Sequence, residues 1–135
     1  MHFERRNFII LTAGAAALAA VAPGCTVLKG EGEMYGLISK MNAAPGQLEA
    51  LITILLESVG GMPGCLSYIV SKDIADANAI WITEVWDSQA SHQASLSLPS
   101  VQQAISRGKP LIARFGERIV TEPVGGHGLS PTKPR

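Results

Sequence analysis

AIWITEVWDSQASHQASLSLPSV, residues 79–101, changes from a strand pattern to a helix pattern and contains both tryptophans of the chain. Its first eight residues are mainly β-branched or aromatic, and they alternate with a period of two, as in a strand. The strand places side chains on two faces, Ile80, Ile82, Glu84 and Trp86 on one and Trp81, Thr83 and Val85 on the other. This composition predicts a central strand over residues 79–86.

The second half of the same stretch predicts a helix in two pieces. Asp87 or Ser88 is suited to the N-cap, because either side chain can accept a hydrogen bond from a free amide of the first turn. A short helix follows to Leu96, and Pro99 begins a second piece, because proline is tolerated at the first helical position. We expect the broken helix to run from Ser88 to about Arg107.

The remaining elements are predicted from the same periodicities. Strands are expected over residues 35–41, 65–71 and 115–121, with residues 111–114 as a short connection. A helix opens at Pro45-Gly46-Gln47 and ends at Gly60-Gly61. Its apolar stripe is Leu48, Leu51, Ile52, Leu55 and Val59. The order β-α-β-β-α-β predicts an α+β, ferredoxin-like antiparallel sheet with helices on one face.

The N-terminal region has the layout of an export signal. Arg5-Arg6 precedes an apolar, alanine-rich run, which is typical of a twin-arginine signal. Residues 1–25 are therefore predicted to direct export to the periplasm or cell envelope. Ala22-Pro23-Gly24-Cys25 resembles a lipobox, which would make Cys25 a lipid anchor; cleavage after Ala20 and an uncleaved anchor are the alternatives. Residues 26–33 are predicted to be a linker, 34–122 the domain, and 123–135 an irregular tail.

Composition excludes some classes of function. The formal net charge is zero and the pI is about 6.8, so the basic surface expected of a nucleic-acid-binding protein is missing. The sequence contains no glycine-rich nucleotide loop, and its histidines, such as His92 and His127, are not spaced as metal ligands. No cofactor is therefore expected.

Several short motifs occur together in an informative order. They are Pro45-Gly46-Gln47, Met62-Pro63-Gly64-Cys65, Glu84-Val85-Trp86, Asp87-Ser88 and Leu98-Pro99-Ser100-Val101. From Met34 to Pro123 the chain thereby resembles the antibiotic biosynthesis monooxygenase family, which includes candidate quinol monooxygenases. The resemblance implies a homodimer in which two sheets form an α+β barrel. It also implies oxidation of phenolic or quinol substrates by molecular oxygen without metal or flavin.

Such chemistry requires an apolar pocket, one base and one or two hydrogen-bond donors. His92 is the candidate base, because histidine exchanges protons near neutral pH; the alternative is a solvent-exposed helix residue. Tyr68 is the candidate catalytic donor that orients the substrate; the alternative is a half-buried strand tyrosine. The candidate substrate-binding residues are Trp86, Trp81, Asn42, Arg114 and Ser95. Large aromatic residues in strands are more often core or interface residues, and polar residues such as Asn42 and Arg114 are more often simply solvated.

Two hypotheses about function follow. The first is a cofactor-independent monooxygenase acting on a quinol or other small phenolic or polyketide-like compound. The second is a non-catalytic dimeric module that binds a small hydrophobic ligand in the cell envelope. Ser95 and Ser100 stand where many members of the resembled family carry histidine. A carboxylate at Glu84, inside an apolar strand, needs a partner; Arg118 or Lys40 is expected to pair with it in a structural role.

Overall fold

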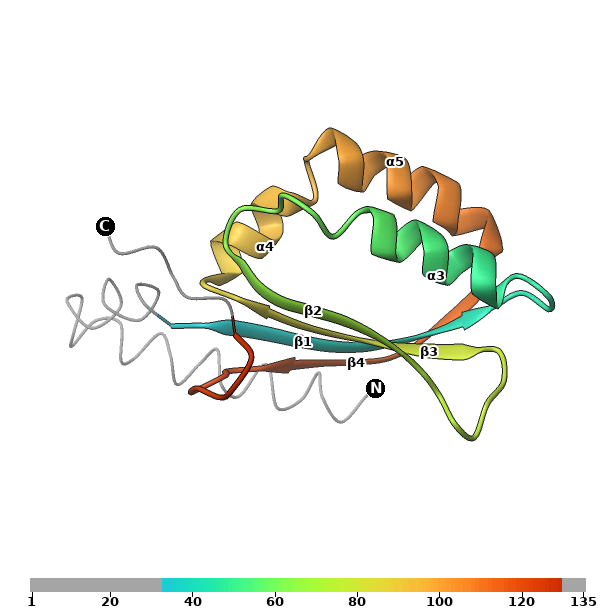
Figure 1. Cartoon of the computed structure of the whole chain (residues 1–135), viewed down its shortest axis with the longest axis horizontal. Coiled ribbons are helices and arrows are strands. Elements are labelled where there is room, and N and C mark those ends of the chain that lie inside the picture. The colour runs from blue at the N-terminus through green and yellow to red at the C-terminus, as the bar shows by residue number, and fades with distance from the viewer. Residues whose placement is uncertain (1–32, 130–135) are drawn as a thin grey trace, which may run out of the picture. The chain divides into compact units, whose positions relative to one another are not determined.

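The computed structural model describes residues 33–129. They form a four-stranded antiparallel sheet in the order β2-β3-β1-β4, with the helices on one face (Figure 1). The elements are β1 (Tyr35–Ala43), α3 (Leu48–Glu57), β2 (Cys65–Lys72), β3 (Ala79–Trp86), α4 (Gln89–Ser95), α5 (Pro99–Gly108), the 3-10 helix η1 (Lys109–Leu111) and β4 (Ile112–Thr121). The predicted α+β, ferredoxin-like fold is confirmed, including the helix broken in two.

The predicted export signal over residues 1–25 and the lipid attachment at Cys25 lie outside the described residues, as do most of the linker and the last part of the tail. Residues 122–129 contain neither helix nor strand. Between residues 33 and 129, no helix has the length and apolar character needed to cross a membrane.

Strand β3 occupies an interior position of the sheet. It pairs with β1 from Ala79 to Trp86 and with β2 on its other side. Ile80, Ile82 and Trp86 are buried, as the period-two pattern predicts for a face covered by helices. Burial of these large side chains, at about 1.5–3 kcal/mol each, is a main source of the stability of the fold.

Helix α3 packs its apolar stripe onto this face. Leu51 is fully buried and forms a core with Ala43 and Ile80, against which Leu48, Ile52 and Leu55 also pack. The helix ends at Glu57, so Val59 lies beyond it rather than in its last turn. Gly108, near the end of α5, approaches Leu51 closely: a Cβ there would lie 3.4 Å from Leu51 Cδ1. The small residue allows the two helices to pack together over the sheet.

The start of β4 differs from the prediction. We expected residues 111–114 to be a connection, but β4 begins at Ile112 and already pairs there with Ala43. Ala44 N donates to Leu111 O over 2.8 Å, so the last residue of η1 already lies at the edge of the sheet, next to the end of β1. Arg114 is consequently inside the strand, opposite Asn42, and two register shifts accommodate the extra length.

The turn before β2 contacts the turn after β3. Gly64 has a φ of +82°, a conformation that glycine adopts without the steric penalty of a side chain. Its carbonyl accepts a hydrogen bond of 2.8 Å from Asp87 N. Ser88 then caps α4, its Oγ accepting from Ser91 N over 3.1 Å. This junction fixes the direction in which α4 leaves the sheet.

Gly64→Ala is expected to destabilise the protein more than Gly46→Ala. Both glycines have positive φ, so either substitution should lower the free energy of unfolding by about 1 kcal/mol through backbone strain. At Gly64 the added Cβ would also lie 2.5 Å from Ser91 Oγ, whereas Gly46 has open space. Overpacking should raise the total to at least about 2 kcal/mol. Urea unfolding measures both, and equal losses would contradict the role of the junction.

Candidate functional site

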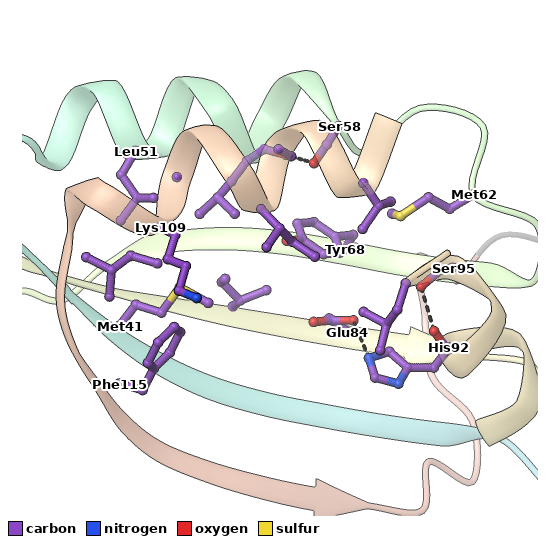
Figure 2. A pocket seen from close by; sticks show the side chains of 18 of the residues that line it. Met41, Leu51, Ser58, Met62, Tyr68, Glu84, His92, Ser95, Lys109 and Phe115 are labelled. Carbon is purple, nitrogen blue, oxygen red and sulfur yellow. Dashed lines mark hydrogen bonds and ion pairs between the residues drawn. The ribbon is translucent and has the colours of Figure 1, made fainter. Parts of the chain in front are cut away.

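A pocket of about 450 Å³ lies between the sheet and the helices. Pockets that hold small organic ligands measure about 300–1,000 Å³, so this one is large enough for such a ligand. Strands β1 and β3 form its floor and helices α3 and α5 part of its walls (Figure 2). Apolar side chains from these elements line most of it, among them Met41, Ile82, Leu51, Leu55, Val101 and Ile105.

One end of the pocket is polar. Glu84 and Tyr68 are direct partners across β3 and β2, so both side chains point to the same face of the sheet. His92, on α4, faces Glu84 across this end, with His92 Nε2 and Glu84 Oε2 3.8 Å apart (Figure 2). The capped start of α4 thus sets the position of the imidazole over the strand.

Glu84 is held by its neighbour two residues along the strand. Trp86 Nε1 donates a hydrogen bond of 2.8 Å to Glu84 Oε2. The carboxylate side chain is only 12% exposed. Burial raises the pKa of the Glu84 carboxyl above its ordinary value, and the hydrogen bond from Trp86 and the charges of His92 and Arg118 offset this only in part. The carboxyl is therefore a stronger proton acceptor than a solvated one.

The expected partners of Glu84 are corrected in part by the structure. Lys40 points to the opposite face of the sheet, where its ammonium lies 3.5 Å from Asp73 Oδ2. Arg118 acts on Glu84 through its charge alone. The contacts of Glu84 are with Trp86 and His92 instead, so the carboxylate belongs to the pocket.

Tyr68 remains a neutral hydroxyl at this end of the pocket. Burial, followed by the negative charges of Glu84 and Cys65, raises the pKa of Tyr68 well above its usual range. A phenol in this state is a hydrogen-bond donor over the whole physiological pH range. Its place beside Glu84 suits it to orient a substrate oxygen.

His92 is buried rather than exposed to solvent, with 8% of its surface accessible. Its ring lies 5.2 Å from that of Tyr35 and 5.4 Å from that of Trp86, centroid to centroid, so aromatic side chains hold its orientation. His92 Nδ1 is buried and has no hydrogen-bond partner. The other ring nitrogen, Nε2, is the one that faces Glu84 at the polar end of the pocket.

The other residues predicted for the site divide into two groups. Trp86 and Ser95 line the pocket, and Ser95 Oγ donates to His92 O over 2.6 Å. Trp81 is on the opposite face of the sheet, where its Nε1 donates to Asp73. Asn42 shares that face and donates to Asp76. Arg114 is exposed on β4, and none of these last three lines the pocket.

Sequence reasoning assigned Glu84 only a structural role and did not single out Lys109, which also lines the pocket. A signal for Glu84 was present, since the period-two alternation places it on the same face as Trp86. Within residues 33–129, no three His, Cys, Asp or Glu side chains are grouped so that they could hold a metal ion. The chemical groups at the polar end are thus a carboxyl, an imidazole and a phenol.

The fold and the pocket together define the class of this protein: a ferredoxin-like α+β domain with a carboxyl and an imidazole at one end of an apolar pocket. The family model for antibiotic biosynthesis monooxygenases matches residues 34–107. The chain belongs to this family, as its motifs indicated. No curated protein matches the chain significantly.

Solved structures of similar proteins support this assignment. The chain is 65% identical to a candidate antibiotic biosynthesis monooxygenase of Chloroflexus aurantiacus, with a TM-score of 0.70, and the match covers 72% of this chain and 99% of the other. PA3566 of Pseudomonas aeruginosa is 25% identical, with a TM-score of 0.60 and coverages of 69% and 96%. A Caulobacter crescentus protein at 15% identity and a TM-score of 0.60, with coverages of 73% and 94%, shares the fold.

Glu84→Gln is expected to change the pH dependence of stability. Because the pKa of Glu84 is raised in the folded protein, its contribution to stability is complete below the ordinary carboxyl pKa of about 4.3 and is lost as pH rises through the folded value. The amide keeps the acceptor for Trp86 and does not ionise. The variant should therefore gain stability relative to wild type as pH rises through this window, as measured by urea unfolding.

Glu117→Gln, at an exposed carboxylate on β4, is the matched control for the loss of one charge. The same pH dependence in both variants would contradict the effect of burial on Glu84.

Proposed function

We propose that the protein is a cofactor-independent monooxygenase that oxidises a quinol or other small phenolic compound with molecular oxygen. The observation that carries this proposal is the Glu84–His92 pair at the end of an apolar pocket. A phenol needs a base to become electron-rich, and an apolar enclosure keeps water away from the reactive intermediates. Both requirements are supplied by side chains of this chain.

The spacing of the pair suits a substrate hydroxyl. At 3.8 Å, His92 Nε2 and Glu84 Oε2 are too far apart for a hydrogen bond to each other. A hydroxyl oxygen at about 2.8 Å from His92 Nε2 can donate its proton to that nitrogen. His92 then accepts the phenolic proton, the Glu84 carboxylate stabilises the resulting imidazolium, and Tyr68 donates a hydrogen bond to the substrate oxygen.

The substrate supplies all the electrons of the reaction. The phenolate passes one electron to dioxygen, and the substrate radical and superoxide combine to form a carbon–oxygen bond. Protonation gives a hydroperoxide at that ring carbon. Loss of water then breaks the oxygen–oxygen bond and the adjacent carbon–hydrogen bond and leaves a carbonyl. A phenol and dioxygen thus give a quinone and water, and His92 returns the proton that it took.

Oxygen uptake by the purified full chain with a panel of quinols and naphthols tests this proposal. We expect uptake faster than autoxidation in the buffer blank and unaffected by a metal chelator. His92→Ala removes the base and should lower kcat/KM by about 100-fold or more. Glu84→Gln, which leaves the imidazolium without its counter-charge, should lower it in the same direction.

His127→Ala, which removes a histidine of the exposed tail, is the matched control and should leave the rate unchanged. Uptake no faster than the blank with every compound, together with tight binding of the same compounds, would favour the ligand-binding module instead.

We further propose that the protein is a homodimer. On the sheet face opposite the helices, one row of paired residues crosses all four strands, and three of its four members are isoleucines: Ile69, Thr83, Ile38 and Ile119. Ile69 is 53% and Ile119 47% exposed, although both lie within strands. Exposed apolar area of this kind is typical of a surface that associates. The family resemblance adds that two such sheets pack face to face.

Ile69→Asp is expected to dissociate the dimer, because it would place a charge in the apolar contact between the sheets. Analytical ultracentrifugation should show a shift toward monomer. Ile74→Asp, at a fully exposed position in the loop between β2 and β3, is the control and should sediment like wild type. A monomeric wild-type protein at micromolar concentration would refute the assembly.

A further inference from the structure

We propose that Lys109 binds an anionic group of the ligand, so that the pocket selects hydroxylated aromatic compounds that carry a carboxylate at the end remote from the hydroxyl. The inference rests on the proposed function, because it takes the polar end at Glu84 and His92 as the site of the hydroxyl. It adds the substrate class and a residue that determines specificity. Its evidence is the position, the surroundings and the charge of one lysine.

Lys109 continues the side of α5 that faces the pocket. Val101, Ala104, Ile105 and Gly108 line the pocket at helical spacing, and residue 109 follows four positions after Ile105. Position 109 therefore belongs to the same stripe, where an apolar residue would complete the wall. The chain places a lysine there, and Figure 2 shows its side chain extending into the pocket near Met41 and Phe115.

The lysine lies at the end of the pocket opposite the acid–base pair. Figure 2 shows Glu84, His92 and Tyr68 toward one end of the pocket and Lys109 toward the other. The labelled lining residues near Lys109, Met41, Leu51 and Phe115, are apolar. The ammonium is consequently the one charged group at that end among the described lining residues. A ligand that spans the pocket would contact a proton acceptor at one end and a positive charge at the other.

Among residues 33–129, no carboxylate pairs with the ammonium of Lys109. The other two lysines between residues 33 and 129 have carboxylate partners, Lys40 with Asp73 and Lys72 with Glu49. Lys109 forms no ion pair with the described residues. Lys109 is exposed, so water solvates its ammonium in the free protein, and an anionic group of a bound ligand can take the place of that water.

The test measures binding rather than turnover. The probes are a hydroxynaphthoic acid, with its hydroxyl and carboxyl groups at opposite ends of the ring system, and its methyl ester. The titrations are run without dioxygen, so isothermal titration calorimetry with the full chain reports affinity alone, whether or not either probe is a substrate. We expect the acid to bind about tenfold more tightly than the ester, as one charge-assisted hydrogen bond allows.

Lys109→Met, which keeps the apolar stem and removes the charge, should abolish the preference and leave the affinity for the ester unchanged. Lys109→Arg should restore most of it, and Lys72→Met, at a lysine away from the pocket, should have no effect. Unfolding midpoints equal to wild type confirm that the variants are folded.

Three results would overturn the inference. In the first, wild type binds the acid and the ester equally, which would mean that the stem of Lys109 covers the pocket while its ammonium stays in water. In the second, the preference survives in Lys109→Met. In the third, Arg118→Gln alone abolishes the preference, which would place the anion beside β4. If the protein shows no oxygen uptake but still binds the acid more tightly than the ester, the proposed reaction is refuted while the proposed class of ligand is retained.

Discussion

The site depends on one buried carboxylate. Glu84 lies on the covered face of a central strand because the alternation of β3 places it there with Ile82 and Trp86. A charge in that position is unfavourable unless polar groups surround it. Three groups meet this need: the indole N–H of Trp86, the imidazole of His92 and the hydroxyl of Tyr68. They come from β3, α4 and β2 respectively. The arrangement concentrates the polarity of an otherwise apolar pocket at one end.

Much of the fold could be predicted from the sequence because its elements have clear periodicities. Strand β3 and the helix broken before Pro99 are local patterns, and their bounds were found closely. The start of β4 was missed, because pairing of Ile112 with Ala43 is a long-range contact that local composition does not encode. The faces of β3 were predicted, but which face the helices cover was not, so Trp81 and Trp86 could not be told apart.

The candidate site was predicted in its residue types more than in its geometry. His92, Tyr68, Trp86 and Ser95 do meet at one pocket. Asn42 was expected to bind substrate just beyond the predicted strand, yet β1 continues through it and turns its side chain to the opposite face. Lys109 was overlooked for a physical reason: a lysine after a helix usually caps the last carbonyls or is solvated. Only the three-dimensional position relative to the pocket distinguishes it.

The break between α4 and α5 divides the residues that line the pocket into two groups, each on its own helical segment. His92 and Ser95 belong to α4, whereas Val101, Ile105 and Lys109 belong to α5 and η1, and the extended backbone of Leu98 divides the two. A substitution that shifts or reshapes α5 therefore need not move the imidazole. Members of such a lineage can diverge in the size and charge of the molecules that they accept while their proton-transfer groups stay in place. A broken helix thus gives the fold freedom to change its substrate without rebuilding its chemistry.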